Sequence, residues 1–447
     1  MQTNFTAEQL KNPAIEEAES ILRKCVHCGF CTATCPTYVI TGDERDSPRG
    51  RIWMIRDLLQ DGDAAQPNEI EQTGYHLDRC LTCLSCMTTC PSGVDYMHLV
   101  DIGRAETEKK RSRPMMDRLV RWMLSVMVPR PRLFRLGLIA AALSQPLKGL
   151  MPRQIAAMLA LAPRRVKPLD PVGSADQSYP ATGTQKAHVI LLAGCAQRAI
   201  EPEINAASIR LLNRHGVRVS VRSQSKCCGA LAHHINAEEA AHEAMTNTIA
   251  AFDGLMRSEK IDAVIVNTSG CGTTLKDYGH HFSHDPKWAE PAKRVSDAAC
   301  DITEFLARLP ALEAVRDIRG VKIGYHAACS LQHGQKITDL PKSLLSGLGF
   351  QIASPKNPHL CCGSAGVYNV LQPELSGALK ARKVETLDAL DVPMVVAGNI
   401  GCINQMQDAR AEVVHLVQLL DWATGGPDII GADMQGLGAK LIDSKAS

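Results

Sequence analysis

The sequence of 447 residues lacks the long apolar run that a membrane-spanning helix needs. No uncharged apolar stretch reaches about 18 residues. The nearest candidate, Leu136–Leu147, has 12 residues and contains a proline. The N-terminus is polar and partly acidic, without the basic and apolar regions of a secretory signal. We therefore expect a cytoplasmic protein with no transmembrane helix.

The sequence also lacks an excess of one charge and two common nucleotide-binding motifs. Its formal net charge is +2, which does not favour a nucleic-acid partner. It contains no G-x-G-x-x-G motif after a strand and no P-loop. We therefore expect no binding to nucleic acid, and no hydride transfer by this chain alone.

Cysteine, in contrast, is abundant. The chain has 17 cysteines, an odd number, and they are clustered rather than spread along the sequence. An odd and clustered set fits metal or redox chemistry in a reducing compartment better than a framework of disulfides.

Eight of these cysteines form two copies of the motif C-x2-C-x2-C-x3-C-P. The copies are Cys25, Cys28, Cys31 and Cys35 with Pro36, and Cys80, Cys83, Cys86 and Cys90 with Pro91. This is the bacterial ferredoxin spacing for [4Fe–4S] clusters, in which the fourth cysteine of each motif serves the other cluster. The rule assigns Cys25, Cys28, Cys31 and Cys90 to one cluster and Cys80, Cys83, Cys86 and Cys35 to the second. Zinc is the alternative, but two C-x2-C pairs would suffice for one zinc ion, and the trailing C-x3-C-P would then have no role.

The segment between the two motifs has the pattern of a helix. Ser47 is suited to an N-cap and Pro48 to the first turn. Ile52, Ile55, Leu58 and Leu59 are spaced along one helical face. We expect this helix to pack over the clusters. Arg49 and Arg51 could neutralise cluster charge or lie on a solvated surface.

The middle of the chain is basic. Residues 109–167 contain 14 Lys or Arg and one acidic residue, Asp117, interleaved with apolar residues and cut by prolines into short helices. Such amphipathic helices can lie on an anionic membrane surface, dock on an acidic partner subunit, or form a solvated face. The following stretch, Leu169–Thr184, is rich in Pro, Gly, Ser and Thr and is expected to be an exposed linker.

The C-terminal half contains an internal repeat that carries eight further cysteines. Each copy has one cysteine, a Cys-Cys-Gly sequence 32 positions later, and a last cysteine 43 or 40 positions beyond that. The quartets are Cys195, Cys227, Cys228 and Cys271, and Cys329, Cys361, Cys362 and Cys402. In each copy, strand-like and helix-like segments alternate, which predicts a parallel sheet with right-handed crossovers.

The predicted sheets place all eight cysteines just beyond the carboxyl ends of strands, where open α/β sheets bind ligands. We therefore predict one metal or redox site per repeat, with Gly229 and Gly363 permitting a tight turn beside the paired thiols. The alternative is eight buried structural cysteines. Cys300 has no counterpart and is expected to be a buried apolar residue. His233, His234 and His326 lie beside the motifs. They could bind a metal or support its ligands, but we favour interpreting them as ordinary structural or solvent-exposed histidines.

The complete pattern, two ferredoxin motifs followed by two Cys-Cys-Gly domains, resembles the iron–sulfur subunits of bacterial glycolate oxidase. The stretches CVHCGFCTATCPTY with SPRGRI, and CLTCLSCMTTCPSGVDY, carry the closest likeness. Similar architectures occur in the iron–sulfur subunits of anaerobic glycerol-3-phosphate dehydrogenase and heterodisulfide reductase. In some of the latter the repeat ends in C-x2-C and holds an unusual cluster. Here Cys271 and Cys402 each lack that further thiol.

The resemblance implies an electron-transfer subunit with two [4Fe–4S] clusters, and further iron–sulfur or metal centres in the repeats. Flavin-containing partner subunits, carrying FAD, would oxidise glycolate to glyoxylate, because a flavin joins hydride and one-electron chemistry. This chain would pass the electrons toward a quinone or another acceptor, in peripheral contact with the inner face of the cell membrane through its basic middle. The alternatives are a subunit of a lactate or glycerol-3-phosphate dehydrogenase, a catalytic heterodisulfide-type reductase, and a cluster-bearing regulatory module.

The predicted fold class is therefore multidomain, combining α+β and α/β parts. A helical two-cluster ferredoxin domain (1–108) is followed by a basic helical segment and linker (109–185). Two repeated α/β Cys-Cys-Gly domains with parallel sheets complete the chain (186–310 and 318–447).

Overall fold

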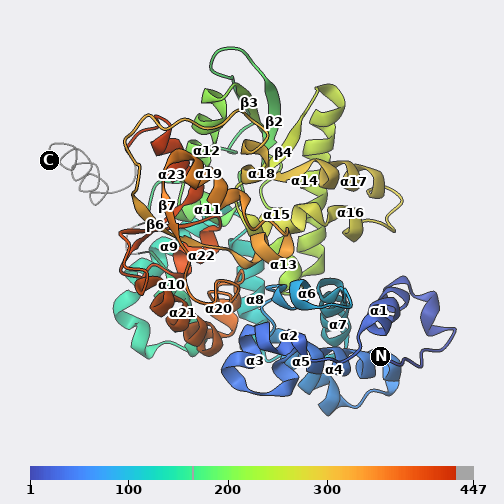
Figure 1. The fold of residues 1–447 in the computed structure, drawn as a ribbon. Coiled ribbons are helices and arrows are strands. Elements are labelled where there is room, and N and C mark those ends of the chain that lie inside the picture. Colours follow the sequence, from blue (N-terminus) through green and yellow to red (C-terminus); the bar gives the residue numbers. More distant parts are fainter. Residues whose placement is uncertain (164–165, 429–447) are drawn as a thin grey trace.

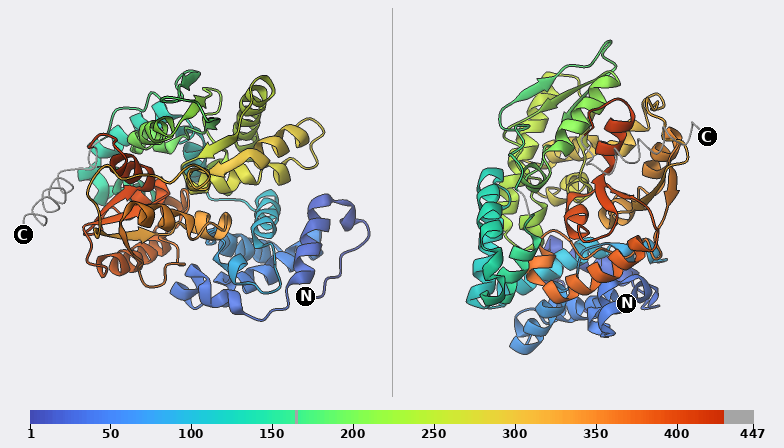
Figure 2. Two further views of the ribbon diagram at one scale, coloured as in Figure 1. Left: turned by 45° about the horizontal axis from the view of Figure 1, so that its top comes forward. Right: turned by 90° about the vertical axis from the view of Figure 1, so that its left-hand side faces the viewer.

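The computed structural model describes residues 1–163 and 166–428. The last part of the predicted second Cys-Cys-Gly domain, residues 429–447, lies outside the described residues, as do Arg164 and Arg165 of the basic middle. The described chain forms a helical lobe at the N-terminus and two lobes that each contain a sheet (Figure 1). Figure 2 shows the same three lobes from two further directions. The predicted fold class is confirmed.

The N-terminal lobe is helical. Its α-helices are α1 (Pro13–Lys24), α2 (Phe30–Thr34), α3 (Pro36–Thr41), α4 (Pro48–Asp61), α5 (Pro67–Asp78), α6 (Ser85–Thr89) and α7 (Tyr96–Lys110). Helix α4 begins as its sequence predicts, because Pro48 occupies the first turn and the Ser47 side chain accepts a hydrogen bond from the Gly50 amide. Its predicted apolar face is buried against α5 and α7.

The basic middle forms the predicted short helices, each bounded by proline. These are α8 (Met115–Met127), α9 (Pro131–Leu143), the 3-10 helix η4 (Gln145–Leu150) and α10 (Arg153–Leu161). Pro114 precedes α8, and Pro131 occupies the first turn of α9. Helix α9 packs on α11 (Ala196–Ile200), and α10 packs on α20 (Tyr368–Leu371), so this segment contacts both repeats.

The predicted linker is only partly exposed. Within it, β1 (Gln177–Tyr179) pairs antiparallel with β3 (Val217–Val221) of the first repeat. Asp170 and Val172, in the same stretch, are also buried. The Asp170 carboxylate accepts a hydrogen bond from Asn205, and Val172 packs in the core of the first sheet. The segment is therefore an edge of the first sheet-containing lobe, which its turn-forming composition concealed.

The first repeat forms a five-stranded sheet in the order β1-β3-β2-β4-β5. The pairs β2 (Ala187–Leu191) with β3, β2 with β4 (Ala263–Val266), and β4 with β5 (Ala299–Asp301) are parallel. The crossover helices are α12 (Glu203–Arg214) and α14 (Glu238–Ser258), each with an apolar face buried on the sheet. The lobe also contains α13 (Ala230–His234), α15 (Ser269–Lys276), α16 (Tyr278–His281), α17 (Ala289–Ala298) and α18 (Ile302–Leu306).

The second repeat forms a four-stranded parallel sheet in the order β7-β6-β8-β9. Its strands are β6 (Lys322–His326), β7 (Gln351–Ala353), β8 (Met394–Ala397) and β9 (Glu412–His415), and its main helices are α19 (Leu340–Leu348), α21 (Pro373–Asp388), α22 (Ile400–Gln405) and α23 (Leu416–Ala423). A π-helical turn, η5 (Ser330–Gly334), follows the first cysteine of this repeat. Single π turns are frequent at functional sites.

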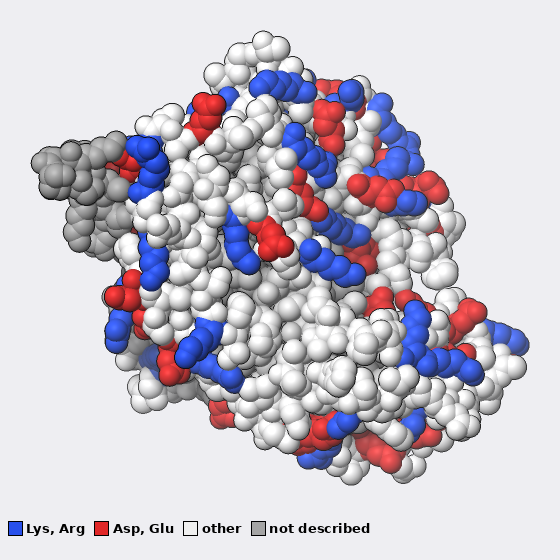
Figure 3. Space-filling view, viewed as in Figure 1, with Lys and Arg blue, Asp and Glu red and all other residues white. Residues whose placement is uncertain are grey.

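The two repeats share one hydrophobic core. Residues of both sheets lie in a single buried cluster, and α12 of the first repeat packs against α23 of the second. Cys300 lies in this core, which confirms its expected apolar role. No helix in the described ranges has both the length and the apolar character needed to cross a bilayer. Lysines and arginines are interspersed with acidic residues on the face drawn in Figure 3, in keeping with the small net charge.

Candidate metal centres

The two ferredoxin motifs fold into the same local loop. In each, the residue before the second cysteine and the residue after it have positive φ: His27 (55°) and Gly29 (82°) in the first motif, Thr82 (50°) and Leu84 (63°) in the second. Such backbone is costly for residues other than glycine and is typical of functional loops. A short helix then begins in each motif, α2 and α6, and the two helices pack together.

Two neighbouring cavities lie between these loops. The first is lined by Cys25, Cys28, Cys31, Cys86 and Cys90. The second is lined by Cys35, Cys80, Cys83 and Cys86. The fourth cysteine of each motif therefore lies with the first three of the other motif, and Cys86 lies between the two cavities. This is the arrangement that the crossing rule of two-cluster ferredoxins requires.

Arg51 is a buried cation at the second cavity. Its side chain is 1% exposed, and its guanidinium lies 4.0 Å from the Cys35 sulfur and 3.5 Å from the Asp46 carboxylate. Burial lowers the pKa of Arg51, but Cys80, Tyr96, Cys35 and Asp46 outweigh burial and raise it, so the group stays charged. The structure therefore excludes a solvated surface position for Arg51 and leaves the other predicted role, neutralising the charge of a cluster.

Arg51 and Arg104 also act on Cys80. Burial raises the pKa of this thiol, but the two arginines outweigh burial and lower it. Arg104 is held in place by hydrogen bonds that it donates to the Leu77 and Cys80 carbonyls, at 3.2 and 2.7 Å. At Cys80 the two arginines therefore favour thiolate, the form that binds metal.

The first Cys-Cys-Gly quartet comes together at the carboxyl ends of three parallel strands. Cys195 follows β2, Cys227 and Cys228 follow β3, and Cys271 lies in α15 after β4. The thiols form a continuous series of hydrogen bonds, from Cys195 to Cys227, Cys228 and Cys271. Hydrogen bonding to Cys227 and burial raise the pKa of Cys195 well above its usual value.

The second quartet has the same arrangement. Cys329 follows β6, Cys361 and Cys362 follow β7, and Cys402 lies in α22 after β8. The sulfur atoms of Cys329 and Cys361 are 3.8 Å apart. The series of thiol hydrogen bonds continues through Cys362 to Cys402.

The glycine of each Cys-Cys-Gly sequence has the predicted tight backbone. Gly229 has a φ of 82° and Gly363 a φ of 88°. In both repeats the glycine amide donates a hydrogen bond of 3.4 Å to the sulfur of the first paired cysteine, Cys227 or Cys361. The turn therefore points a backbone N–H group at a thiol that a metal centre would use.

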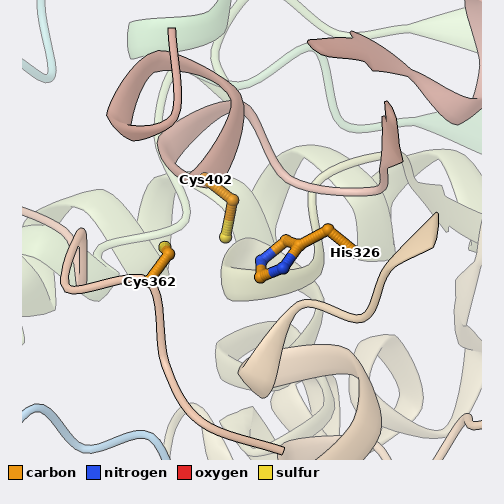
Figure 4. A group of neighbouring side chains, drawn as sticks. All are labelled: His326, Cys362 and Cys402. Carbon is orange, nitrogen blue, oxygen red and sulfur yellow. The ribbon is translucent and has the colours of Figure 1, made fainter. Parts of the chain in front are cut away.

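The histidines differ from one another. His233 bonds the Asp101 carboxylate of α7 at 3.1 Å, so it joins the first repeat to the helical lobe. His326 instead lies with Cys362 and Cys402, all three buried, with possible ligand atoms within 4.8 Å of one another (Figure 4). Interpreting His326 as an ordinary histidine overlooked this placement. The sequence feature that could have indicated a place in the site was the position of His326 at the end of a strand, three residues before Cys329.

Cys83 connects the second cavity with the second quartet. It shares a small buried cluster with Cys361, and Cys329 packs against that cluster. Burial and the nearby Cys361 raise the pKa of Cys83 well above its usual value. No cysteine of the first quartet belongs to that cluster, so the helical lobe approaches the two repeats unequally.

Comparison with known proteins agrees with this architecture. Residues 24–94 match the 4Fe-4S dicluster domain family, and residues 189–276 and 323–407 match the cysteine-rich domain family that includes the Cys-Cys-Gly sequence. The chain is 40% identical to the glycolate oxidase iron-sulfur subunit of Escherichia coli (strain K12), over 95% of this chain and 99% of that protein.

The chain belongs to the family of glycolate oxidase iron–sulfur subunits. It is accordingly an iron–sulfur electron-transfer subunit with two [4Fe–4S] clusters, and part of an oxidoreductase complex. A probable member of the family from Bacillus subtilis (strain 168) is 29% identical over 95% of this chain and 99% of that protein.

More distant relatives share part of this family's architecture. Lactate utilization protein A of Shouchella clausii (strain KSM-K16) is 26% identical over 52% of this chain and 98% of that protein. A crystal structure of a hypothetical protein from Helicobacter pylori has a similar fold, with a TM-score of 0.54 and 9% identity, covering 94% of this chain and 75% of that one.

Proposed function

We propose that this chain relays electrons within a glycolate dehydrogenase complex, in which a flavin-containing partner oxidises glycolate to glyoxylate and a quinone or another carrier accepts the electrons. The observation that carries the proposal is the pair of adjacent cavities in which the cysteines of two motifs cross. The 40% identity to a glycolate oxidase subunit, over nearly the whole of both chains, supports glycolate over lactate.

In this proposal the first cavity holds one [4Fe–4S] cluster and the second cavity holds the other. The ligands are Cys25, Cys28, Cys31 and Cys90 for the first, and Cys80, Cys83, Cys86 and Cys35 for the second. When bound, such clusters accept and donate single electrons. The chain's own groups would hold the thiolates around each cluster and place the Arg51 charge beside Cys35.

The proposed division of labour follows the domains: residues 1–108 for the two clusters, residues 109–185 for attachment, and residues 186–310 and 318–447 for the two Cys-Cys-Gly sites. Each quartet brings four cysteine sulfurs together beyond the ends of its parallel strands, a donor set that suits an iron–sulfur or another metal centre.

Peripheral contact with the cytoplasmic face of the cell membrane forms part of the proposal. Helix α8 exposes Met115, Leu119 and Trp122, whose spacing puts them on one helical face. Arg118 lies exposed beside them, whereas the carboxylate of Asp117 is bound by Arg113 and Arg121. An exposed apolar face with an exposed cation beside it suits an anionic lipid surface.

The experiment is anaerobic purification of the chain alone and together with its flavin partner. Alone, it should contain at least about eight irons per chain and give the EPR signals of reduced [4Fe–4S] clusters. Glycolate-dependent dye reduction should require both proteins. Colourless, iron-free material would refute the electron-transfer role, and disulfide reduction by the isolated chain would favour the catalytic reductase instead.

A further inference from the structure

The two Cys-Cys-Gly sites differ at the position three residues before their first cysteine. Leu192 lies three residues before Cys195, and His326 lies three residues before Cys329. Both side chains are 1% exposed. Leu192 packs in the apolar cluster beneath the first quartet. The repeat therefore presents an aliphatic side chain in one copy and an imidazole in the other.

The imidazole of His326 has no hydrogen bond of ordinary geometry to either ring nitrogen among the described residues. A buried polar group without a partner is destabilising, so such a group in a native protein usually has a ligand or a specific role. Figure 4 shows the ring directed toward the side chains of Cys362 and Cys402. Possible ligand atoms of these three residues all lie within 4.8 Å of one another.

The cysteines around His326 complete a set of metal donors. Cys362 and Cys402 each offer a buried sulfur close to the imidazole. The other two cysteines of this quartet continue the donor set, since Cys361 bonds both Cys329 and Cys362. The second site therefore offers four sulfur donors and one nitrogen donor, whereas the first offers sulfur alone.

We propose that the second Cys-Cys-Gly site is a mixed cysteine–histidine iron–sulfur centre with His326 as a nitrogen ligand, and that the first site is all-cysteine. This inference rests on the proposal that the quartets hold metal. In this centre His326 takes the place of one of the four thiolates at iron. Replacing thiolate by neutral imidazole at iron raises the reduction potential of a cluster. The second site, beside Cys83, would then be the more easily reduced of the two and would draw electrons from the helical lobe.

Pulsed EPR on the reduced full-length protein, with and without ¹⁵N-labelled histidine, tests the inference. We expect a strong histidine nitrogen coupling that changes with the label and is lost in His326→Leu, which copies the first repeat. His326→Cys is a second variant that keeps a metal ligand at this position. It should retain iron, lose the histidine coupling and lower the reduction potential of the second site. His415→Asn is the matched control, since His415 is equally buried and its replacement can keep the helix cap of α23.

A histidine coupling that persists in both His326 variants, or its absence from a wild-type protein with an iron-loaded second site, would overturn the inference. Stoichiometric zinc in place of iron at that site would overturn it as well. The underlying proposal is tested separately with Cys361→Ser combined with Cys402→Ser. Iron content unchanged by that double variant would show that the quartet holds no iron, whatever the role of His326.

Discussion

Arg51 is the clearest example of a single residue that acts through its burial. Its guanidinium donates to the His76 carbonyl at 2.8 Å and to the Thr37 hydroxyl at 3.2 Å, so two hydrogen bonds fix it beside Cys35. A cation held this way stabilises additional negative charge, and a reduced cluster carries one more negative charge than an oxidised one. Arg51 should therefore raise the potential of the cluster in the second cavity.

We predict that Arg51→Met lowers the midpoint potential of that cluster by about 60 mV or more, which corresponds to a tenfold weaker stabilisation of the reduced state for one electron. A redox titration followed by EPR measures it. Arg23→Met is the control, because the Arg23 side chain is 64% exposed, is paired with Glu19 and lines neither cavity. Equal shifts in both variants would contradict a specific role for Arg51.

The cysteines themselves give a second prediction at this scale. Cys28→Ser and Cys83→Ser should each lose one [4Fe–4S] cluster, about four irons per chain, because serine is a poor ligand in place of thiolate. Activity of the complex should collapse, while circular dichroism should show that the two sheet-containing lobes remain folded. Iron analysis measures the loss, and normal iron and activity in both variants would rule out the ligand assignment.

The sequence could predict which cysteines belong together, because their spacing is a local property. It could not decide the roles of Arg51 and His326. Each contacts residues from other parts of the chain: Arg51 contacts Thr37 and His76, which lie 14 and 25 residues away, and His326 lies beside Cys362 and Cys402. The sequence around a single arginine or histidine looks the same whether its side chain lies on the surface or in a buried metal site.

At the scale of single elements, the turn after each cysteine pair depends on glycine. A Cβ atom on Gly363 would lie 2.7 Å from the Ser376 carbonyl oxygen of α21, closer than such atoms approach. Gly366, three residues later, also has a positive φ, but a Cβ atom added there would meet no other atom within 4 Å.

We predict that Gly366→Ala destabilises the protein by about 1 kcal/mol, the cost of the left-handed backbone alone. Gly363→Ala should cost at least about twice as much, because the backbone of α21 must also move. Chemical denaturation measures both, with iron content recorded alongside. Equal costs for the two variants would show that the contact with Ser376 does not matter.

The exposed face of α8 gives a further prediction for an element. Replacing Leu119 and Trp122 together by serine should weaken binding to vesicles with anionic lipids by at least about tenfold, because each side chain buries apolar surface in the bilayer. Co-sedimentation measures binding, and added salt should weaken it too.

Val315→Ser is the control for α8, since Val315 is 68% exposed but lies outside the basic middle. Unchanged vesicle binding in the α8 variant, with loss of binding to the flavin partner, would assign this face to the partner subunit.

Elements with a strong period or a clear cap could be predicted from the sequence, among them α4, α12, α14, β3 and β4. Elements that depend on distant partners could not. Strand β1 is a three-residue edge strand that pairs with β3, some forty residues later. The π-helical turn η5 likewise gave no local sign, and it packs on α15 of the other repeat.

At the scale of the whole molecule, the helical lobe binds both repeats. Tyr368 of the second repeat donates a hydrogen bond to the Arg79 carbonyl at 3.0 Å. His98 of α7 bonds Asp277 of the first repeat at 3.1 Å and Asp95 at 2.8 Å. The ring of His98 also stacks on His280 at 3.6 Å, and Glu17 lies 3.9 Å away.

This contact should depend on pH. Burial lowers the pKa of His98, but the hydrogen bonds to Asp277 and Asp95 outweigh burial and raise it from 6.5 to about 10. A raised pKa gives stability that is fully present below pH 6.5 and is lost as the pH rises from there to about 10.

We predict that the stability advantage of the wild type over His98→Gln is largest near pH 6 and disappears toward pH 10. Thermal unfolding of both proteins across this range measures it, and the difference between them removes the titration of other groups. His284→Gln, at an exposed histidine, should show no such trend. An advantage that stays constant with pH would mean that His98 acts without its charge.

The crossing of the cysteines has a consequence for how the protein is made. The first cavity includes Cys90. Its full set of thiols is therefore available only after the second motif has emerged from the ribosome. Before that point, three of the four cysteine ligands of the first cluster are present without the fourth. Iron delivered earlier in synthesis would find an incomplete ligand set, so insertion of the cluster should follow the folding of α2 through α6.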